Sequence, residues 1–121
     1  MIDTRPAIID LKTYVPAENF ELSKQFYRDL GFELTEAWGG NFDCKLGGAQ
    51  FRLQNYYVKV WAENFMMQFQ VDDAQAWYDH VKPIIDNGRY INARVGKPEI
   101  HDGATIVHVH DPCGVLLIFI Q

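Results

Sequence analysis

The spacing of apolar residues changes twice in the first half of the chain. Residues 8–15 form a short apolar-rich run closed by Pro16, which is typical of a strand. Apolar residues then recur at helical spacing up to Gly31, and because glycine commonly follows a helix end, a helix is predicted there. Short apolar runs separated by Gly-Gly pairs predict a meander of strands. The predicted elements are a strand at 8–15, a helix at 18–30 and strands at 32–38, 42–46 and 50–54.

The second half of the chain repeats this order. Residues 65–71 have the pattern of a strand, and Asp72 or Asp73 is a suitable N-cap for a second helix with apolar residues at helical spacing. Pro83 is expected to end or kink that helix, because its ring removes a backbone donor and clashes with the preceding turn. Further strands are predicted at 89–95, 105–110 and 115–120.

A strand, a helix and three strands therefore occur twice, which is the pattern of two stacked copies of one structural unit. The 121 residues, 48% of them apolar, are enough for one core of ordinary size. We predict one domain over residues 1–121, with unit one at 1–55, a linker at 56–64 and unit two at 65–121.

Three motifs occur in the order found in a known superfamily. They are Phe26-Tyr27-Arg28-Asp29-Leu30-Gly31-Phe32, then Val71-Asp72-Asp73-Ala74 with Trp77, and finally Asp111-Pro112-Cys113-Gly114-Val115. Together they resemble the vicinal oxygen chelate superfamily of glyoxalases, bleomycin resistance proteins and extradiol dioxygenases. The resemblance implies an α+β fold of two βαβββ units, whose curved mixed sheets form a cup-like groove with the helices on the outer face.

The resemblance also indicates where enzymes of this superfamily hold their metal ion. The four equivalent positions fall on Asp10, Arg52, Met66 and Ile118. Such a set does not suit a hard divalent ion, which needs several oxygen or imidazole donors, and the arginine adds a competing positive charge. The expectation is therefore a protein without metal or cofactor. If Asp10 and Arg52 share the floor of the groove, an ion pair between them would replace the metal.

A histidine pair is the strongest competing metal signal. His108 and His110 are two positions apart on a predicted strand, so both side chains project from the same face. With Asp111, Glu99 or Asp102 they could make an open facial triad for a transition metal. The alternative is an ordinary polar face of a surface strand.

Aromatic residues are dense between residues 38 and 65 and suggest what the groove could hold. Aromatic walls stack flat heterocycles and attract cations. For Trp38, Phe42, Tyr56 and Trp61, ligand binding and simple packing are equally good interpretations. The candidate ligand-binding residues are Asp10, Trp38, Phe42, Arg52, Tyr56, Trp61 and His110.

Charge and composition exclude several classes of partner. Eleven basic and sixteen acidic residues give a net charge of −5 without any block of like charges, so neither nucleic acid nor a membrane surface is an expected partner. The longest apolar stretch, 115–120, is far shorter than the roughly 20 residues that cross a bilayer. Two cysteines without a CxxC motif fit a reducing compartment, so we expect a cytoplasmic protein.

These observations favour a metal-free small-molecule-binding protein that acts by sequestration, resembles bleomycin resistance proteins and forms a homodimer. Its ligand is expected to be planar or cationic. The main alternative is an enzyme. It would be a metal-dependent lyase, isomerase or dioxygenase of the glyoxalase type using His108 and His110, or a metal-free acid–base catalyst using Asp10 or Glu63. A third possibility is a protein-interaction module with a flat aromatic patch.

Overall fold

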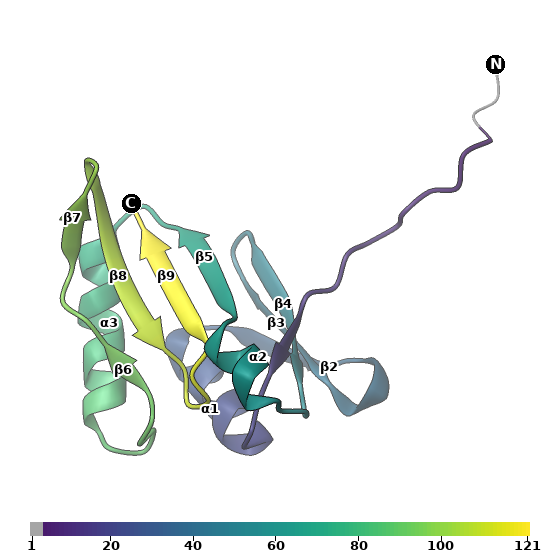
Figure 1. Cartoon of the computed structure of the whole chain (residues 1–121), viewed down its shortest axis with the longest axis horizontal. Coiled ribbons are helices and arrows are strands. Elements are labelled where there is room, and N and C mark those ends of the chain that lie inside the picture. Colours follow the sequence, from purple (N-terminus) through teal and green to yellow (C-terminus); the bar gives the residue numbers. More distant parts are fainter. Residues whose placement is uncertain (1–3) are drawn as a thin grey trace.

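The computed structural model describes residues 4–121, so the first three residues of the predicted unit one lie outside it. Residues 4–121 form two β-sheets and three α-helices (Figure 1). The first half contains β1 (Tyr14–Pro16), α1 (Phe20–Leu30), β2 (Glu33–Glu36), a 3₁₀ turn (Trp38–Gly40), β3 (Phe42–Leu46) and β4 (Ala49–Gln54). The second half contains α2 (Lys59–Glu63), β5 (Met66–Gln70), α3 (Ala74–Asp86), β6 (Arg94–Val95), β7 (Glu99–His101), β8 (Ala104–His110) and β9 (Leu116–Ile120).

The two sheets share one topology. Sheet A has the order β1-β4-β3-β2, and sheet B has the order β5-β9-β8-β6, with β7 also pairing with β8. In each sheet the first strand of the unit pairs in parallel with the last strand, and the remaining pairs are antiparallel. The predicted α+β fold with two mixed sheets is therefore confirmed.

Local capping explains where the two long helices begin and end. The Asn19 side chain accepts a hydrogen bond from the Leu22 N–H at the start of α1, and Gly31 ends that helix in the left-handed conformation that favours glycine. At the start of α3, Asp73 accepts from the Ala76 N–H, so Asp73 is the N-cap. No helix of residues 4–121 is long and apolar enough to span a bilayer.

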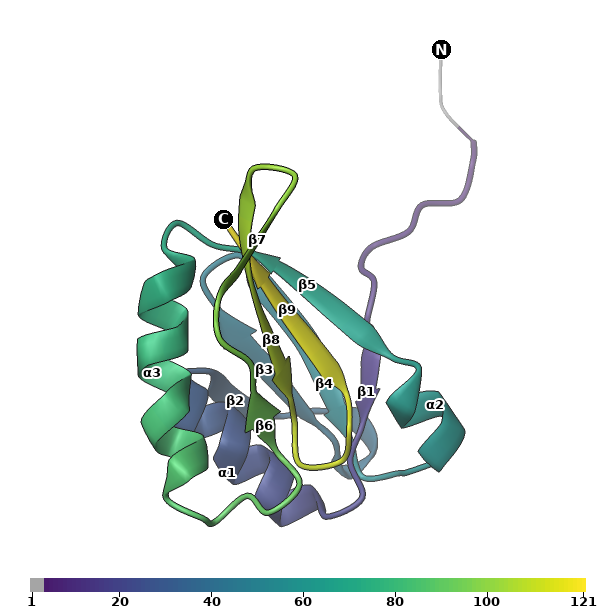
Figure 2. The same cartoon turned by 60° about the vertical axis from the view of Figure 1, so that its left-hand side comes forward.

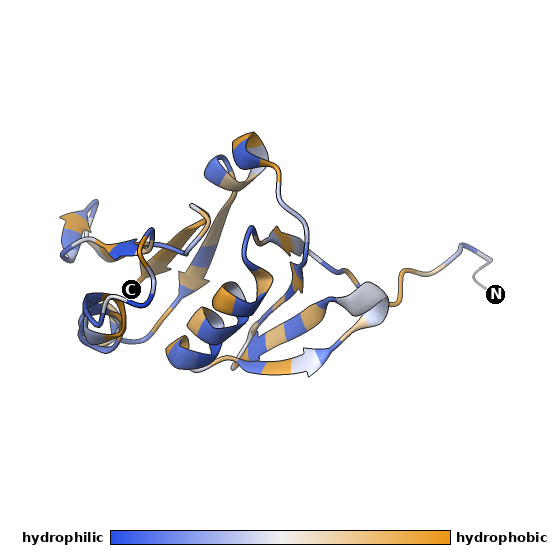
Figure 3. Ribbon diagram, turned by 90° about the horizontal axis from the view of Figure 1, so that it is seen from below, coloured by the Kyte–Doolittle hydropathy of each residue, from blue (hydrophilic) through white to orange (hydrophobic). Residues whose placement is uncertain are grey.

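Each sheet has a face covered by a helix and a face that no helix of the described chain covers, which we call its open face (Figure 2). Along most strands apolar and polar residues alternate, which separates the two faces (Figure 3), whereas β9 is apolar throughout. The covered face of sheet A includes Cys44, Phe51 and Leu53 and meets α1, whereas the covered face of sheet B includes Phe119, against which Trp77 of α3 stacks.

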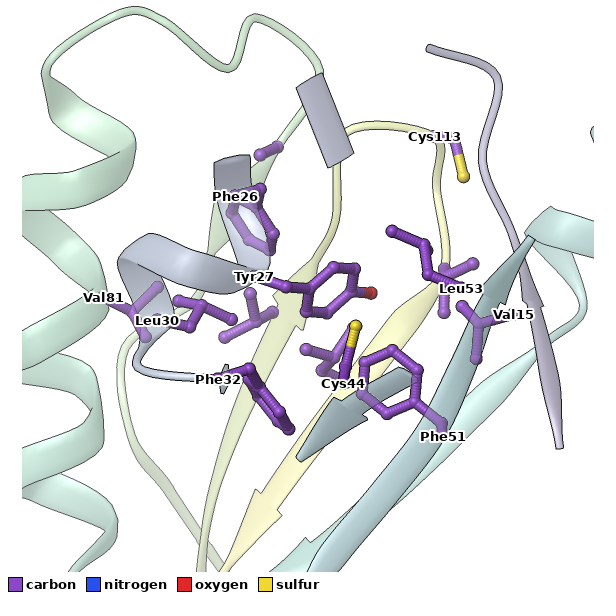
Figure 4. Close-up of a cluster of buried hydrophobic side chains, with 14 of the residues drawn as sticks. Val15, Phe26, Tyr27, Leu30, Phe32, Cys44, Phe51, Leu53, Val81 and Cys113 are labelled. Carbon is purple, nitrogen blue, oxygen red and sulfur yellow. The ribbon is translucent and has the colours of Figure 1, made fainter. Parts of the chain in front are cut away.

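The core joins both units around the aromatic ring of Tyr27 (Figure 4). This ring makes edge contacts with Phe26, Phe32 and Phe51 at centroid distances of 5.4, 5.8 and 5.0 Å. Phe32 in turn lies 6.1 Å from Phe69 of the second unit. One continuous apolar cluster thus fixes α1, sheet A and sheet B relative to one another.

The strand predicted at 8–15 is wrong for all but its last two residues. Sheet pairing in this region begins only at Tyr14, which lies opposite Arg52 of β4. Residues 4–13 instead form an arm that extends away from the body of the molecule (Figures 1 and 2). Apolar side chains in the arm are almost fully exposed, with Ile8 at 90% and Ile9 at 99%.

The structure differs from the sequence-based expectations in several further elements. The strand expected at 89–95 is reduced to its last two residues, and both α2 and β7 were missed because, at five and three residues, they are too short to show a period. Helix α3 does not end at Pro83 but continues to Asp86. It continues because Ile84 and Ile85 extend the apolar stripe that packs against the core.

One buried carboxylate organises the turn between β8 and β9. Asp111 is fully buried, and its Oδ2 accepts a 2.7 Å hydrogen bond from the Tyr27 hydroxyl. Its Oδ1 accepts from the backbone N–H groups of Cys113 and Val115. Burial raises the pKa of this carboxyl group although all three hydrogen bonds oppose the shift.

We predict that Asp111→Ala lowers the free energy of unfolding by about 3 kcal/mol, because two N–H groups and one hydroxyl lose their acceptor in a dry environment. Asp111→Asn is expected to cost less than half as much, since the amide oxygen can still accept both N–H bonds. Urea unfolding followed by circular dichroism measures both values. Equal losses for the two variants would contradict this role of the carboxyl group.

A comparison of the wild-type protein with Asp111→Asn at several pH values tests the raised pKa of this carboxyl group. A carboxyl group whose folded-state pKa is raised stabilises the fold below its unfolded pKa and loses that contribution as pH rises through the folded pKa. The wild-type protein should therefore lose stability relative to Asp111→Asn as the pH rises above about 4, the ordinary pKa of an aspartic carboxyl group. A difference between the two proteins that does not change with pH would be contrary to this expectation.

Candidate functional site

The open face of sheet A carries a charged row built by strand register. Tyr14, Arg52 and Asp43 are aligned across β1, β4 and β3. The Arg52 guanidinium makes a two-pronged ion pair with Asp43, at 2.8 Å from Nε to Oδ1 and 3.3 Å from Nη2 to Oδ2. Its Nη1 also donates to the Tyr14 hydroxyl at 3.4 Å. These bonds to the guanidinium lower the pKa of Asp43 and keep it ionised.

The conditional expectation of an ion pair between Asp10 and Arg52 is wrong. Asp10 lies on the arm, four residues before Tyr14, and pairs with Lys12 at 2.7 Å. This contact lowers the pKa of the Asp10 carboxyl group. Lys12 also approaches Asp43 at 4.0 Å, so a chain of charges runs from the arm onto the sheet. Because the first strand begins later than predicted, Arg52 pairs across the sheet with Asp43 instead.

The open face of sheet B is mostly aliphatic. Strand register aligns Met66 with Leu116 and, two residues further along each strand, Gln68 with Ile118. These side chains alternate with the fully buried Leu117 and Phe119 of the covered face. Met66 is 61% exposed, and the aliphatic residues of β9 on this face are partly exposed. Positions 66 and 118, which the sequence resemblance equates with metal-ligand positions, thus lie on this open face and carry apolar side chains.

The two histidines predicted to share a strand face do so. His108 is aligned with Ile118 and His110 with Leu116, so both imidazoles lie on the open face of sheet B. Arg94 of the neighbouring strand β6 is the cross-strand partner of His110. Burial lowers the pKa of His110, and the nearby Arg94 and His108 lower it further, so its imidazole is neutral at pH 7.

The surroundings of the histidines do not form a metal site. Within residues 4–121, no group of three His, Cys, Asp or Glu side chains is placed to hold a metal ion. Asp111, the nearest candidate for a third ligand, is buried in the core and bonded to Tyr27. Arg94 beside His110 would also repel a cation. Burial raises the pKa of both thiols, Cys44 and Cys113, to about 12, so neither is an activated nucleophile.

His110 also lines a polar cavity of about 680 Å³ at the edge of sheet B. The cavity lies between α2, β6 and the turn after β8, and its charged lining residues are Glu18, Lys59, Glu63 and Arg94. Opposite charges line the same hollow, so it has no single preferred ligand charge. Glu63, the predicted acid–base candidate, is half exposed and 3.8 Å from Lys59.

The aromatic candidates do not gather in one wall. Trp38 is 79% exposed at the turn between β2 and β3, whereas Tyr56 and Trp61 are exposed near α2. Phe42 lies on the covered face of sheet A, 5.9 Å from Phe20, and the Lys24 ammonium sits 4.3 Å above its ring. Three of the four are thus available to a ligand or a partner, and Phe42 is a packing residue.

Sequence reasoning missed Asp43, Tyr14, Arg94 and Leu116 as members of the open faces. The alternation of β3 could have placed Asp43 on the same face as Lys45. For Leu116 there was no usable signal, since every residue of β9 is apolar and its two faces differ only through the fold.

Comparisons with known proteins come from structure alone, because no family model and no curated protein sequence matches the chain. A bleomycin resistance determinant encoded on the transposon Tn5 is 23% identical, with a TM-score of 0.74, over 94% of this chain and 98% of that one. A bleomycin-binding protein complexed with bleomycin is 24% identical, with a TM-score of 0.76, over the same shares of the two chains. Lactoylglutathione lyase from Agrobacterium tumefaciens is 17% identical, with a TM-score of 0.65, over 95% and 94%.

The structural likeness extends over nearly the whole chain in each case, while the identities are low. It therefore establishes the fold, and the predicted resemblance is confirmed at that level. The chain has the fold seen in the bleomycin resistance determinant, the bleomycin-binding protein and lactoylglutathione lyase.

Proposed function

We propose that this protein binds a small molecule without a metal ion and acts by sequestering it. The observation that carries the proposal is the open face of sheet B. It presents aliphatic side chains beside two imidazoles, with one residue, Met66, largely exposed and no helix of the described chain covering it. Apolar surface with a few fixed polar groups is the usual lining of a small-molecule site.

The similar structures support the same reading. Two of the proteins compared above bind bleomycin or confer resistance to it. In our proposal the ligand of the present chain is likewise a bulky compound with a planar or cationic part. The net charge of −5 favours a cation, and the exposed rings of Trp38, Tyr56 and Trp61 provide surfaces for stacking at the edges of the molecule.

The proposal includes a homodimer, because a single chain does not enclose either open face. The arm supports it: Ile8, Ile9 and Leu11 are 82 to 99% exposed, and such apolar segments are normally covered by a partner. A second exposed apolar group, formed by Val60, Trp61 and Met66 at α2 and the start of β5, offers a surface for the arm of another copy. The proposal also assigns the dimer to the cytoplasm, where both buried thiols stay reduced.

We predict that the double substitution Ile8→Asp with Ile9→Asp converts the dimer to a monomer. Two buried charges in the interface would each weaken association by several kcal/mol. Size-exclusion chromatography with light scattering measures the mass directly. Ile100→Asp is the matched control, since Ile100 is 81% exposed on β7, on the opposite side of the molecule from the arm (Figure 1). A monomeric wild-type protein would contradict the proposal.

For the ligand, we predict that metal-free bleomycin or a compound from a panel of planar cationic dyes quenches the tryptophan fluorescence saturably. Ile118→Lys should weaken that binding about tenfold, because it places a positive charge in the centre of the aliphatic face and repels a cationic ligand. Ile100→Lys serves as the matched control and should bind like the wild-type protein.

Chelation separates this function from the glyoxalase-type alternative. A sequestering protein keeps its ligand affinity in EDTA and contains no stoichiometric transition metal by elemental analysis. If the protein instead carried about one metal ion per chain, and lost both the metal and a lyase activity in His110→Ala, the enzyme would be the correct function.

A further inference from the structure

A second cavity lies within one chain, between the covered faces of the two units. Its volume is about 560 Å³, which is within the size range of drug-sized ligand sites. The walls come from the turn between β3 and β4, from β5, and from the start of α3. Its aromatic lining comes from the covered side, chiefly Phe32, Trp77 and Phe119, and Gln68 of the open face of sheet B also lines it.

One wall of this cavity is a run of nearly parallel aromatic rings. Trp77 stacks on Phe119 at 4.5 Å with an interplanar angle of 19°, and Phe119 stacks on Phe69 at 5.1 Å and 18°. Phe119 is fully buried, whereas Trp77 and Phe69 are only partly buried and line the hollow. A flat aromatic ring entering the cavity can continue this stack.

The charge of the cavity has one sign. Asp72 is the only charged residue among those that line it, and in the described chain its carboxylate makes neither a hydrogen bond nor an ion pair. An adjoining groove of about 310 Å³ shares Leu46, Asp72 and Trp77 with the cavity and adds the carboxylate of Asp73. The cavity and the groove together carry two acidic side chains and the imidazole of His80, with no lysine or arginine, which favours a cation.

Gly47 and Gly48, in the turn between β3 and β4, form a lip of the cavity that carries no side chains. Gly47 has a φ of +56°, a conformation that favours glycine at the first position of a two-residue hairpin turn. A Cβ placed on Gly48 would meet no atom within 4 Å, and its φ is not in the left-handed region. A side chain can thus be introduced at Gly48 without backbone strain, where it would project into open space at the cavity.

From these observations we propose that the cavity is a second binding site, which takes one flat aromatic cation per chain. The ring of the ligand stacks beside Trp77 and Phe69, and its positive charge faces Asp72. This site differs from the open faces of the sheets in that a single chain builds it completely.

The test uses N-methylquinolinium as the probe. The protein is the double variant Trp38→Phe with Trp61→Phe, in which Trp77 is the only tryptophan left. Saturable quenching with one probe bound per chain is the expected result. In this background Asp72→Asn should weaken binding about fivefold, as the loss of one carboxylate at close range implies. Asp102→Asn is the matched control, since it removes the same charge at an exposed turn and asparagine tolerates its positive φ. Quenching that rises linearly with probe concentration, or an equal effect of the two asparagine variants, would overturn the proposal.

Two further variants separate this site from the others. Gly48→Leu narrows the lip and should reduce probe binding without lowering the melting temperature, while bleomycin binding at Ile118 stays unchanged. In Ile8→Asp with Ile9→Asp, which removes the proposed dimer, the probe should bind as before. If the probe bound only after the arm was altered, the arm of a second copy would occupy the cavity in the wild-type protein. The proposed ligand site would then be wrong.

Discussion

The hydrogen bond between the Tyr27 hydroxyl and the buried carboxylate of Asp111 is the constraint on which the rest of the structure depends. It connects α1 of the first unit to the turn before β9 in the second, across 84 positions of sequence. Both groups are removed from water, so neither can leave its partner without losing a strong bond in a dry environment. The aromatic rings of Phe26, Phe32 and Phe51 pack against Tyr27 beside this bond.

This arrangement decides which surfaces remain for function. Both long helices and one face of each sheet are used to build the shared core, and the second face of each sheet stays open. The open faces differ chemically: sheet A offers the Arg52 and Asp43 ion pair, and sheet B offers aliphatic residues beside His108 and His110. Neither face is enclosed by one chain, which is why the proposed ligand site and the proposed dimer depend on each other.

The cavity beside Trp77 has a different origin. It forms where the hairpin of sheet A meets the edge of sheet B, and its aromatic wall is a partly exposed edge of the core itself. In our proposals, binding there needs no second chain, whereas binding at the open faces depends on the dimer. The two sites are therefore separable by the association state of the protein as well as by substitution.

Much of the fold could be predicted from the sequence, because it depends on local interactions. Asp73 and Gly31 mark helix ends through their own backbone and side chains, and the repeated order of strand, helix and strands implies two units of one topology. The arm could not be predicted in this way. Its residues have the pattern of a strand but find no partner strand among residues 4–121.

The candidate site was predicted less completely than the fold, for the same physical reason. Local pattern placed His108 and His110 on one face, since side chains alternate along a strand. Only the tertiary structure decided that Arg52 pairs with Asp43 rather than Asp10, that Phe42 belongs to the covered face, and which side of β9 is open. Those outcomes depend on register and contact between segments far apart in the chain, which residue spacing within one segment does not determine.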